Sequence, residues 1–143
     1  MKRIRPAAVA GAFYTGDPSA LAGEVAAMLE EAEQRLEETA TLPKAVIVPH
    51  AGYIYSGPVA ASAYALLEQG RNIYRRVVLL GPVHRVPVRG LALPSTEGFA
   101  TPLGVVPLDL DAMASLADLP QVVEYDAAHA FEHSLEVQLP FLQ

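Results

Sequence analysis

Two histidines each follow an uninterrupted apolar run. The first run, residues 45–48, leads into PHAG, which contains His50, and the second run, residues 77–80, leads into GPVH, which ends in His84. Imidazole nitrogens are common ligands of transition metals. If the runs are neighbouring parallel strands about 5 Å apart, both imidazoles can reach one point about 2 Å from each nitrogen, as a divalent metal requires. The alternative is that each is a loop histidine hydrogen-bonded to backbone.

The other two histidines, His129 and His133, stand four residues apart in DAAHAFEHSLEVQ. On a helix they would share a face with Glu132 and Glu136. The segment lacks the glutamate placement of an HExxH zinc protease, so that class is not favoured. His133 is instead a candidate acid/base or substrate-binding group, the alternative being an ordinary histidine on a helix surface. Glu132 is a candidate ligand-binding residue and a weak candidate for a base that activates water beside a metal.

Two tyrosines, Tyr53 and Tyr55, follow His50 in PHAGYIYSG. Their hydroxyls could donate hydrogen bonds to an anionic ligand, or their rings could pack under the following helix. Alternate residues of an extended segment point to opposite sides, so we expect at least one of them to pack.

The elements that must position these residues are a strand, a helix and a strand. Residues 45–48 and 77–80 have the pattern of strands buried on both faces, and the helix between them opens at Ser56 and stops at Gly70. This βαβ unit predicts a parallel sheet with a right-handed crossover. Ligands bind at the carboxyl ends of strands in such sheets, which is where both His50 and His84 fall.

The flanking segments predict further short elements. Asp17 and Pro18 have the residue types that begin a helix, and apolar residues then recur at three- and four-residue spacing. Beyond residue 85 we expect a short helix capped by Asp109, a helix over residues 132–143 that Pro140 bends or ends, and short strand-like segments at residues 88–93, 104–106 and 122–125.

Composition limits the classes of protein. The 143 residues fit a single domain, and with 52% hydrophobic and 18% charged residues the chain is too apolar to be disordered. A net charge of −6 with scattered basic residues does not favour nucleic-acid binding. No apolar stretch has the length of a membrane helix or the form of a signal peptide, so a cytoplasmic location is expected by default. The absence of cysteine excludes disulfides and thiolate metal sites within this sequence.

Five ordered blocks of the sequence together resemble the Memo-like family, whose bacterial members are called AmmeMemoRadiSam system protein B. The blocks are RPAAVAGAFYTGDPSAL, PHAGYIYSGPVAASAYA, LLGPVH, FATPLGVVPLD and EHSLEVQLPFLQ. The resemblance runs along essentially the whole chain. It implies a three-layer α/β/α fold with a mostly parallel or mixed central sheet, similar to class III extradiol dioxygenases, which use non-haem iron(II).

The resemblance also implies roles for individual residues. By their positions in the matching motifs, His50 and His84 look like two of the family's metal ligands, and His133 looks like the pocket histidine that acts as acid/base in the dioxygenase relatives. Iron(II) is the metal implied first, with copper or zinc as alternatives. The family's third ligand, a downstream cysteine or glutamate, is not reached here. Residues 1–143 are therefore expected to form one Memo-like domain that is truncated at its C-terminus, holds metal weakly and is inactive in isolation.

Three functions are compatible with these residues. The first is a metal-binding protein without turnover, whose pocket grips a metal or a phosphorylated or carboxylated ligand. The second is an oxidoreductase of the extradiol-dioxygenase type, and the third is metal-assisted hydrolysis. The family name implies association with radical-SAM and AMMECR-type proteins, although no residue predicts such an interface.

Overall fold

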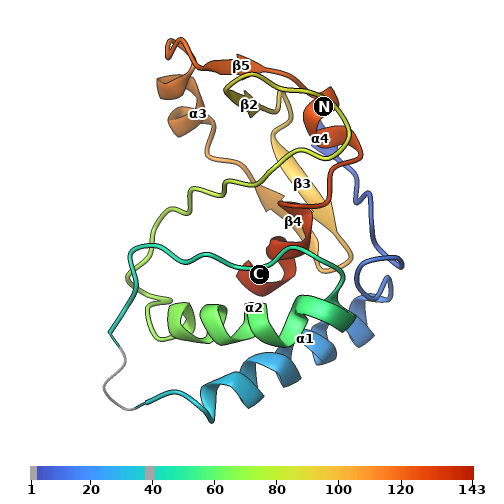
Figure 1. The fold of residues 1–143 in the computed structure, drawn as a ribbon, viewed down its shortest axis with the longest axis vertical. Coiled ribbons are helices and arrows are strands. Elements are labelled where there is room, and N and C mark those ends of the chain that lie inside the picture. Colours follow the sequence, from blue (N-terminus) through green and yellow to red (C-terminus); the bar gives the residue numbers. More distant parts are fainter. Residues whose placement is uncertain (1–2, 38–40) are drawn as a thin grey trace.

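A computed structural model describes residues 3–37 and 41–143 as a mixed α/β protein, which confirms the predicted class. The two longest helices, α1 (Pro18–Glu33) and α2 (Tyr53–Glu68), lie side by side at one end of the molecule, and two small sheets lie toward the other end (Figure 1). None of the helices in the described ranges has the length and apolar character needed to cross a membrane.

Helix α1 begins where the sequence predicts it. The Asp17 side chain accepts a hydrogen bond from the backbone N–H of Ala20 at 2.8 Å, and Pro18 occupies the first turn, where no donor is needed. Its buried face carries Leu21, Val25 and Ala32. This face packs against α2 and contributes to the main hydrophobic core.

Helix α2 begins at Tyr53, three residues before the predicted start at Ser56, and its C-terminal cap residue is Gln69, directly before the predicted stop. Small side chains on the buried face let α1 approach closely. A Cβ atom added at Gly57 would lie only 2.7 Å from the sulfur of Met28 on α1, so this position favours glycine.

The strands form two separate small sheets. In the first, β1 (Ile4–Arg5) runs parallel to β3 (Gly98–Thr101), which pairs antiparallel with β4 (Gly104–Pro107). In the second, β2 (Leu91–Leu93) pairs in parallel with β5 (Val122–Glu124). The predicted strand-like segments beyond residue 85 are therefore confirmed in outline.

Helix α3 (Leu110–Leu116) lies beside the second sheet. Its cap is the one the sequence predicts, because the Asp109 side chain accepts a hydrogen bond from the N–H of Ala112 at 2.9 Å. Like Asp17, this acid satisfies a backbone donor that has no partner inside the helix.

The predicted helix over residues 132–143 is wrong in its extent. A short helix α4 (Ala127–Ala130) ends before this segment begins, and the segment itself contains a non-helical stretch, one 3₁₀ turn η1 (Glu136–Gln138) and the short helix α5 (Leu139–Leu142). Pro140 lies in the first turn of α5 and does not end the helix, because the first turn tolerates a missing N–H. The ring of Phe141 stacks on Tyr64 with centroids 5.0 Å apart, which anchors α5 in the core.

The prediction of strands at residues 45–48 and 77–80 is wrong for this structure. Both segments are extended but unpaired, so no βαβ unit and no central sheet is formed within residues 3–37 and 41–143. A strand needs a neighbouring strand to accept and donate its backbone hydrogen bonds, and no other described strand lies beside these segments. The three-layer arrangement built on them is accordingly not seen in this part of the protein.

A buried ion pair joins the two ends of the described chain. The Arg5 guanidinium, 5% exposed, bonds the Glu136 carboxylate, which is 0% exposed. Glu136 also accepts hydrogen bonds from the N–H groups of Ala8 (2.8 Å) and Val9 (3.0 Å) and from the Tyr14 hydroxyl (2.6 Å). Both carboxylate oxygens are thus engaged, which offsets the cost of burying the charge.

We expect Glu136→Gln to lower the free energy of unfolding by about 3–5 kcal/mol, because it leaves the Arg5 charge buried without a counterion. Urea denaturation followed by circular dichroism measures this. The matched control is Glu31→Gln, which removes an exposed ion pair with Arg35 and should cost no more than about 0.5 kcal/mol. Equal effects of the two substitutions would contradict a structural role for the buried pair.

Candidate metal centre

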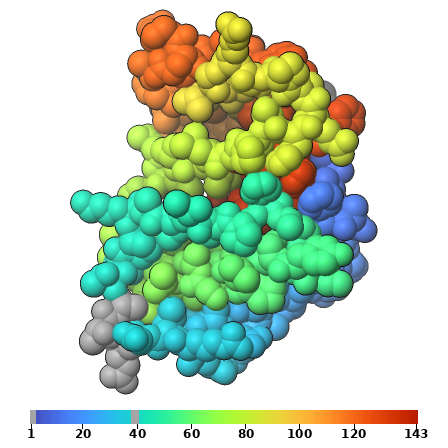
Figure 2. All heavy atoms as spheres, in the orientation of Figure 1, coloured from blue at the N-terminus to red at the C-terminus, as the bar shows by residue number. Residues whose placement is uncertain are grey.

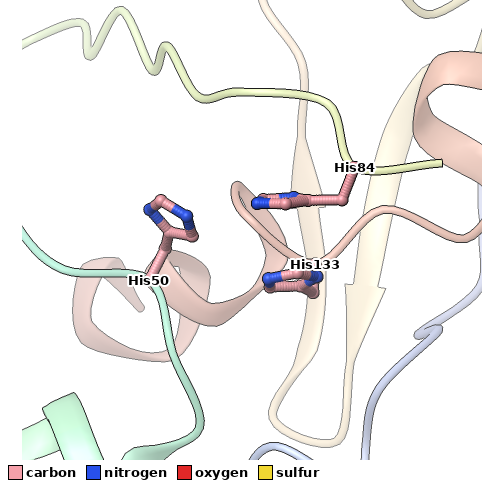
Figure 3. Close-up of side chains that lie close together, drawn as sticks. All are labelled: His50, His84 and His133. Atoms are coloured by element: carbon pink, nitrogen blue, oxygen red, sulfur yellow. The ribbon is translucent and has the colours of Figure 1, made fainter. Parts of the chain in front are cut away.

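Three of the four histidines lie together. The ring centroids of His84 and His133 are 4.5 Å apart, and His50 lies 5.3 Å from the first and 5.9 Å from the second. Each offers a nitrogen, and these nitrogens all lie within 4.8 Å of one another. In Figure 3 the rings of His84 and His133 lie one above the other and turn toward His50.

His50 is placed by the backbone that leads into α2. The carbonyl of the preceding residue, Pro49, accepts a hydrogen bond at 3.0 Å from the side-chain amide of Gln138. Beyond His50, the Tyr53 N–H donates to the carbonyl of Phe13 at 2.7 Å, and a Cβ added at Gly52 would lie 3.3 Å from that carbonyl oxygen. Two distant segments therefore hold this loop, and glycine allows the close approach.

Glu132 positions His84. Its carboxylate accepts hydrogen bonds from the ring Nδ1 of His84 at 2.8 Å and from the backbone N–H of the same residue at 2.5 Å. When Nδ1 donates to a carboxylate, the tautomer is set and the other ring nitrogen, Nε2, is left as a lone-pair donor. This is the arrangement that orients metal-bound histidines.

His133 is held between the same carboxylate and an aromatic ring. Its N–H and that of Ser134 donate to Glu132 at 2.8 and 3.0 Å, and its imidazole packs on Phe13 with centroids 4.5 Å apart. The residue lies outside any helix, so the alternative of an ordinary helix-surface histidine is not what the structure shows. Its side chain is only 15% exposed.

The surroundings favour a neutral imidazole at His133 and an ionised carboxylate at Glu132. Burial acts to raise the pKa of Glu132, but hydrogen bonds from the His84 ring and from three backbone N–H groups outweigh it and hold this pKa at about 2. Burial lowers the pKa of His133, and the nearby His84 and His50 act in the same direction against the opposing effect of Glu132. Neutral imidazole is the form that ligates metals.

The cluster fits a divalent or redox metal by its donors and its spacing. Nitrogens around a tetrahedral metal lie about 3.4 Å apart, so imidazoles whose nitrogens are within 4.8 Å need only a small inward movement. Three imidazoles leave at least one coordination position open, as in catalytic zinc sites, and imidazole also suits iron, copper and nickel. The donor set therefore supports a metal site without choosing the metal. The resemblance implies that the third ligand lies downstream of this sequence. In this structure His133 instead offers a third imidazole next to His50 and His84.

A pocket opens beside the cluster. It has a volume of about 560 Å³ and is lined by residues 49–52, Phe13, Tyr55 and His133. Tyr55 is exposed and borders this space. Tyr53 faces the core instead, where its hydroxyl donates to the Val137 carbonyl at 2.7 Å. At least one of the two tyrosines therefore packs, as the sequence predicts.

His129 lies apart from the other three histidines. Its Nε2 donates to the Ala92 carbonyl at 3.0 Å, and its ring meets Phe99 edge-on. The predicted shared helix face of His129, His133, Glu132 and Glu136 is wrong, because the chain leaves the helix after Ala130. Burial lowers the pKa of His129, which fits a neutral structural residue.

Two of the residues that support the cluster are not predicted from the sequence. Phe13 and Gln138 carried no local signal, because each acts on segments far along the chain. Glu132 was singled out as a ligand-binding group or base. Its carboxylate already accepts four hydrogen bonds, so within this structure it is a positioning residue and is not free to activate water.

The fold and the site define a mixed α/β protein with a three-histidine cluster beside an open pocket. Residues 5–143 match the family described as Memo-like protein. The chain is 40% identical to a MEMO1 family protein of Aquifex aeolicus over 99% of its own length and 50% of that protein. It is 41% identical to a MEMO1 family protein of Ignicoccus hospitalis, over 98% of this chain and 51% of that protein. It is also 41% identical to a MEMO1 family protein of Saccharolobus islandicus, over 100% of this chain and 52% of that protein.

The chain therefore belongs to the Memo-like family, which confirms the resemblance. It spans about half the length of the curated relatives it matches.

We expect Glu132→Gln to lower the free energy of unfolding relative to the wild type, and we expect this difference to depend on pH. The pKa of Glu132 is about 2 in the folded state and about 4.3 when unperturbed, so the ionised carboxylate stabilises the fold above about pH 5, and this contribution is lost as the pH falls toward 2. Because solvent screening weakens this contribution, the pH-dependent part amounts to at most about 3 kcal/mol, and urea denaturation between pH 2 and 7 measures it. A difference that does not change with pH would contradict the assignment. Glu33→Gln, on the exposed face of α1, is the control.

Proposed function

We propose that this chain is a metal-binding protein of the Memo-like family and that His50, His84 and His133 hold the ion. The supporting observation is that three imidazoles from three separate segments converge within 4.8 Å. A chance surface histidine would not be expected to have its tautomer set by a buried carboxylate, as His84 has. Iron(II) is the metal we propose first, because the family resemblance implies it, with copper or zinc as alternatives that suit the same ligands.

His133 has two possible roles in this proposal. The family resemblance implies an acid/base group in the pocket, whereas a ligand role is supported by a ring nitrogen of His133 that lies within 4.8 Å of nitrogens of His50 and His84. Its stacking on His84 and its low exposure favour the ligand role. We therefore propose His133 as the third protein ligand.

Substitution of the three histidines tests the site. We expect the wild type to bind one equivalent of iron(II) under anaerobic conditions, and of zinc(II) as a redox-inert probe. His50→Ala, His84→Ala and His133→Ala should each weaken binding by more than the roughly 10–100-fold that loss of an outer-shell partner causes. Isothermal titration calorimetry and metal analysis measure both quantities.

The matched control is His129→Gln, which removes the one histidine outside the cluster and should leave metal binding unchanged. Full metal content in both His50→Ala and His84→Ala would overturn the site. Metal loss in those two variants but not in His133→Ala would return His133 to the acid/base role.

The open pocket favours a second candidate, an oxidoreductase of the extradiol-dioxygenase type. Its walls of Phe13, Tyr55 and residues 49–52 offer a largely apolar surface beside the cluster, which suits a small aromatic substrate. Iron(II) bound there would supply positions for both oxygen and substrate. Tyr55 would then donate a hydrogen bond to an anionic group of the substrate, while His133 would lie against the bound ring.

A ring-cleavage assay separates the metal-binding protein from the oxidoreductase. We expect the isolated chain, loaded with iron(II) and then exposed to oxygen and catechol, to show no ring-cleavage absorbance, because the pocket is open to water on one side. Ring cleavage that Tyr55→Phe slows and His129→Gln does not would establish the enzyme instead. Stoichiometric metal without turnover supports the binding protein.

A further inference from the structure

His50 is held differently from the other two histidines of the cluster. Glu132 contacts the rings of both His84 and His133. The ring of His50 makes no hydrogen bond within residues 3–37 and 41–143, and in Figure 3 it lies to one side of the stacked pair. The position of the His50 ring therefore depends on the backbone that carries it.

The peptide bond that enters His50 is held at its carbonyl oxygen. The side-chain amide of Gln138 donates from Nε2 to the carbonyl of Pro49 at 3.0 Å. A peptide unit is planar, and the proline ring fixes the φ angle of Pro49. Holding this oxygen therefore also sets the direction in which the backbone enters His50, and with it the region that the imidazole can reach.

A tyrosine sets the orientation of the Gln138 amide. The hydroxyl of Tyr64 donates to Oε1 of Gln138 at 2.9 Å. An amide has one acceptor end and one donor end, so a hydroxyl bound at Oε1 leaves Nε2 to face the Pro49 carbonyl. The reversed amide would place two acceptor oxygens against each other without a proton between them. Burial raises the pKa of Tyr64, so its hydroxyl keeps the proton that it donates.

The relay formed by Tyr64, Gln138 and the Pro49 carbonyl is shielded from water. Tyr64 is 5% exposed and Gln138 is 3% exposed. Figure 2 shows the turquoise and yellow-green segments covering most of the red C-terminal segment on this face of the molecule. Hydrogen bonds are electrostatically stronger in such an interior than in water. A buried amide whose two ends are both bonded has one favoured orientation.

The ring of Tyr64 is fixed independently of its hydroxyl. It stacks on Phe141 of α5 with centroids 5.0 Å apart and an interplanar angle of 2°. Its backbone belongs to α2, the helix into which the His50 loop leads. A residue of this helix thus acts back on the loop through Gln138. Removal of the hydroxyl alone should leave the ring packed in the core.

We propose that Tyr64 is a positioning residue for His50 and that it acts through Gln138. Without the Tyr64 hydroxyl the amide has no preferred orientation, and the Pro49 carbonyl loses its donor in part of the molecules. His50 is then released from the geometry in which the three imidazoles converge. The consequence for metal binding rests on the proposed function, because the position of His50 affects the metal only if His50 is a ligand.

Zinc affinity tests the proposal. Tyr64→Phe should weaken zinc(II) binding by about 2- to 10-fold, the range expected for the loss of one hydrogen bond. Gln138→Met, which has a similar length and no donor, should weaken it by about 10- to 100-fold. The double variant should bind no more weakly than Gln138→Met, because Tyr64 acts only through Gln138. Isothermal titration calorimetry measures the affinities, and circular dichroism verifies that each variant is folded at the temperature of the titration.

Tyr74→Phe is the matched control. It also removes a tyrosine hydroxyl, one that donates to the Pro43 carbonyl at 2.6 Å and lies outside the relay. We expect this variant to bind zinc as the wild type does. Equal losses of affinity in Tyr64→Phe and Tyr74→Phe would overturn the proposal. Losses that add in the double variant would overturn it as well.

The ring signals of the histidines give a second readout that needs no metal. Proton–carbon NMR spectra of the metal-free chain contain the signals of its four histidines, which single substitutions assign. Tyr64→Phe and Gln138→Met should shift the signals of His50. Ser134→Ala, which removes a hydrogen bond to the Pro82 carbonyl, should leave them unchanged.

His50 signals that are the same in the wild type and in both relay variants would overturn the proposal. A wild type that binds no zinc would instead overturn the proposed function, and the ring signals would then decide the relay by themselves.

Discussion

The carboxylate of Glu136 is the constraint on which the rest of the structure depends. It is fully buried and binds four donors from the N-terminal segment: the Arg5 guanidinium, two backbone N–H groups and the Tyr14 hydroxyl. Arg5 also donates from Nε to the carbonyl of His129 and from Nη2 to the carbonyl of Glu132. One ion pair thus clamps the start of the chain to the segment that carries the candidate site.

The same ion pair helps to position the residues of the candidate site. The Glu132 carbonyl is bound by Arg5, and the Glu132 carboxylate in turn holds His84 and the backbone of His133. Gln138, one 3₁₀ turn further on, fixes the loop of His50 through Pro49. Residues 132–138 therefore bring together histidines from three segments, and a metal entering the site would meet ligands that are already oriented. Ser134 in the same stretch donates a hydrogen bond to the carbonyl of Pro82, two residues before His84.

The sequence predicted the features that depend on neighbours in the chain. Asp17 and Asp109 cap helices because an acid at that position always meets free N–H groups. It predicted His50 and His84 as a pair from their matched positions, and the two rings are indeed adjacent. The pair was predicted because two neighbouring parallel strands would carry it, and these strands are not formed here. Strand pairing requires the edge of another strand, and the pattern of apolar residues within a segment does not show whether such an edge lies beside it. Arg5 and Glu136 are 131 positions apart, and only the charge of Glu136 within the apolar segment LEVQLPF hinted at a buried partner.

The central claim is that three imidazoles from this chain surround one ion. X-ray absorption spectroscopy of the protein loaded with one equivalent of zinc(II) counts those imidazoles directly. The account predicts three imidazole nitrogens at about 2.0–2.1 Å, with one fewer in His133→Ala. A first shell with no more than two imidazoles in the wild type, unchanged in His133→Ala, would contradict it.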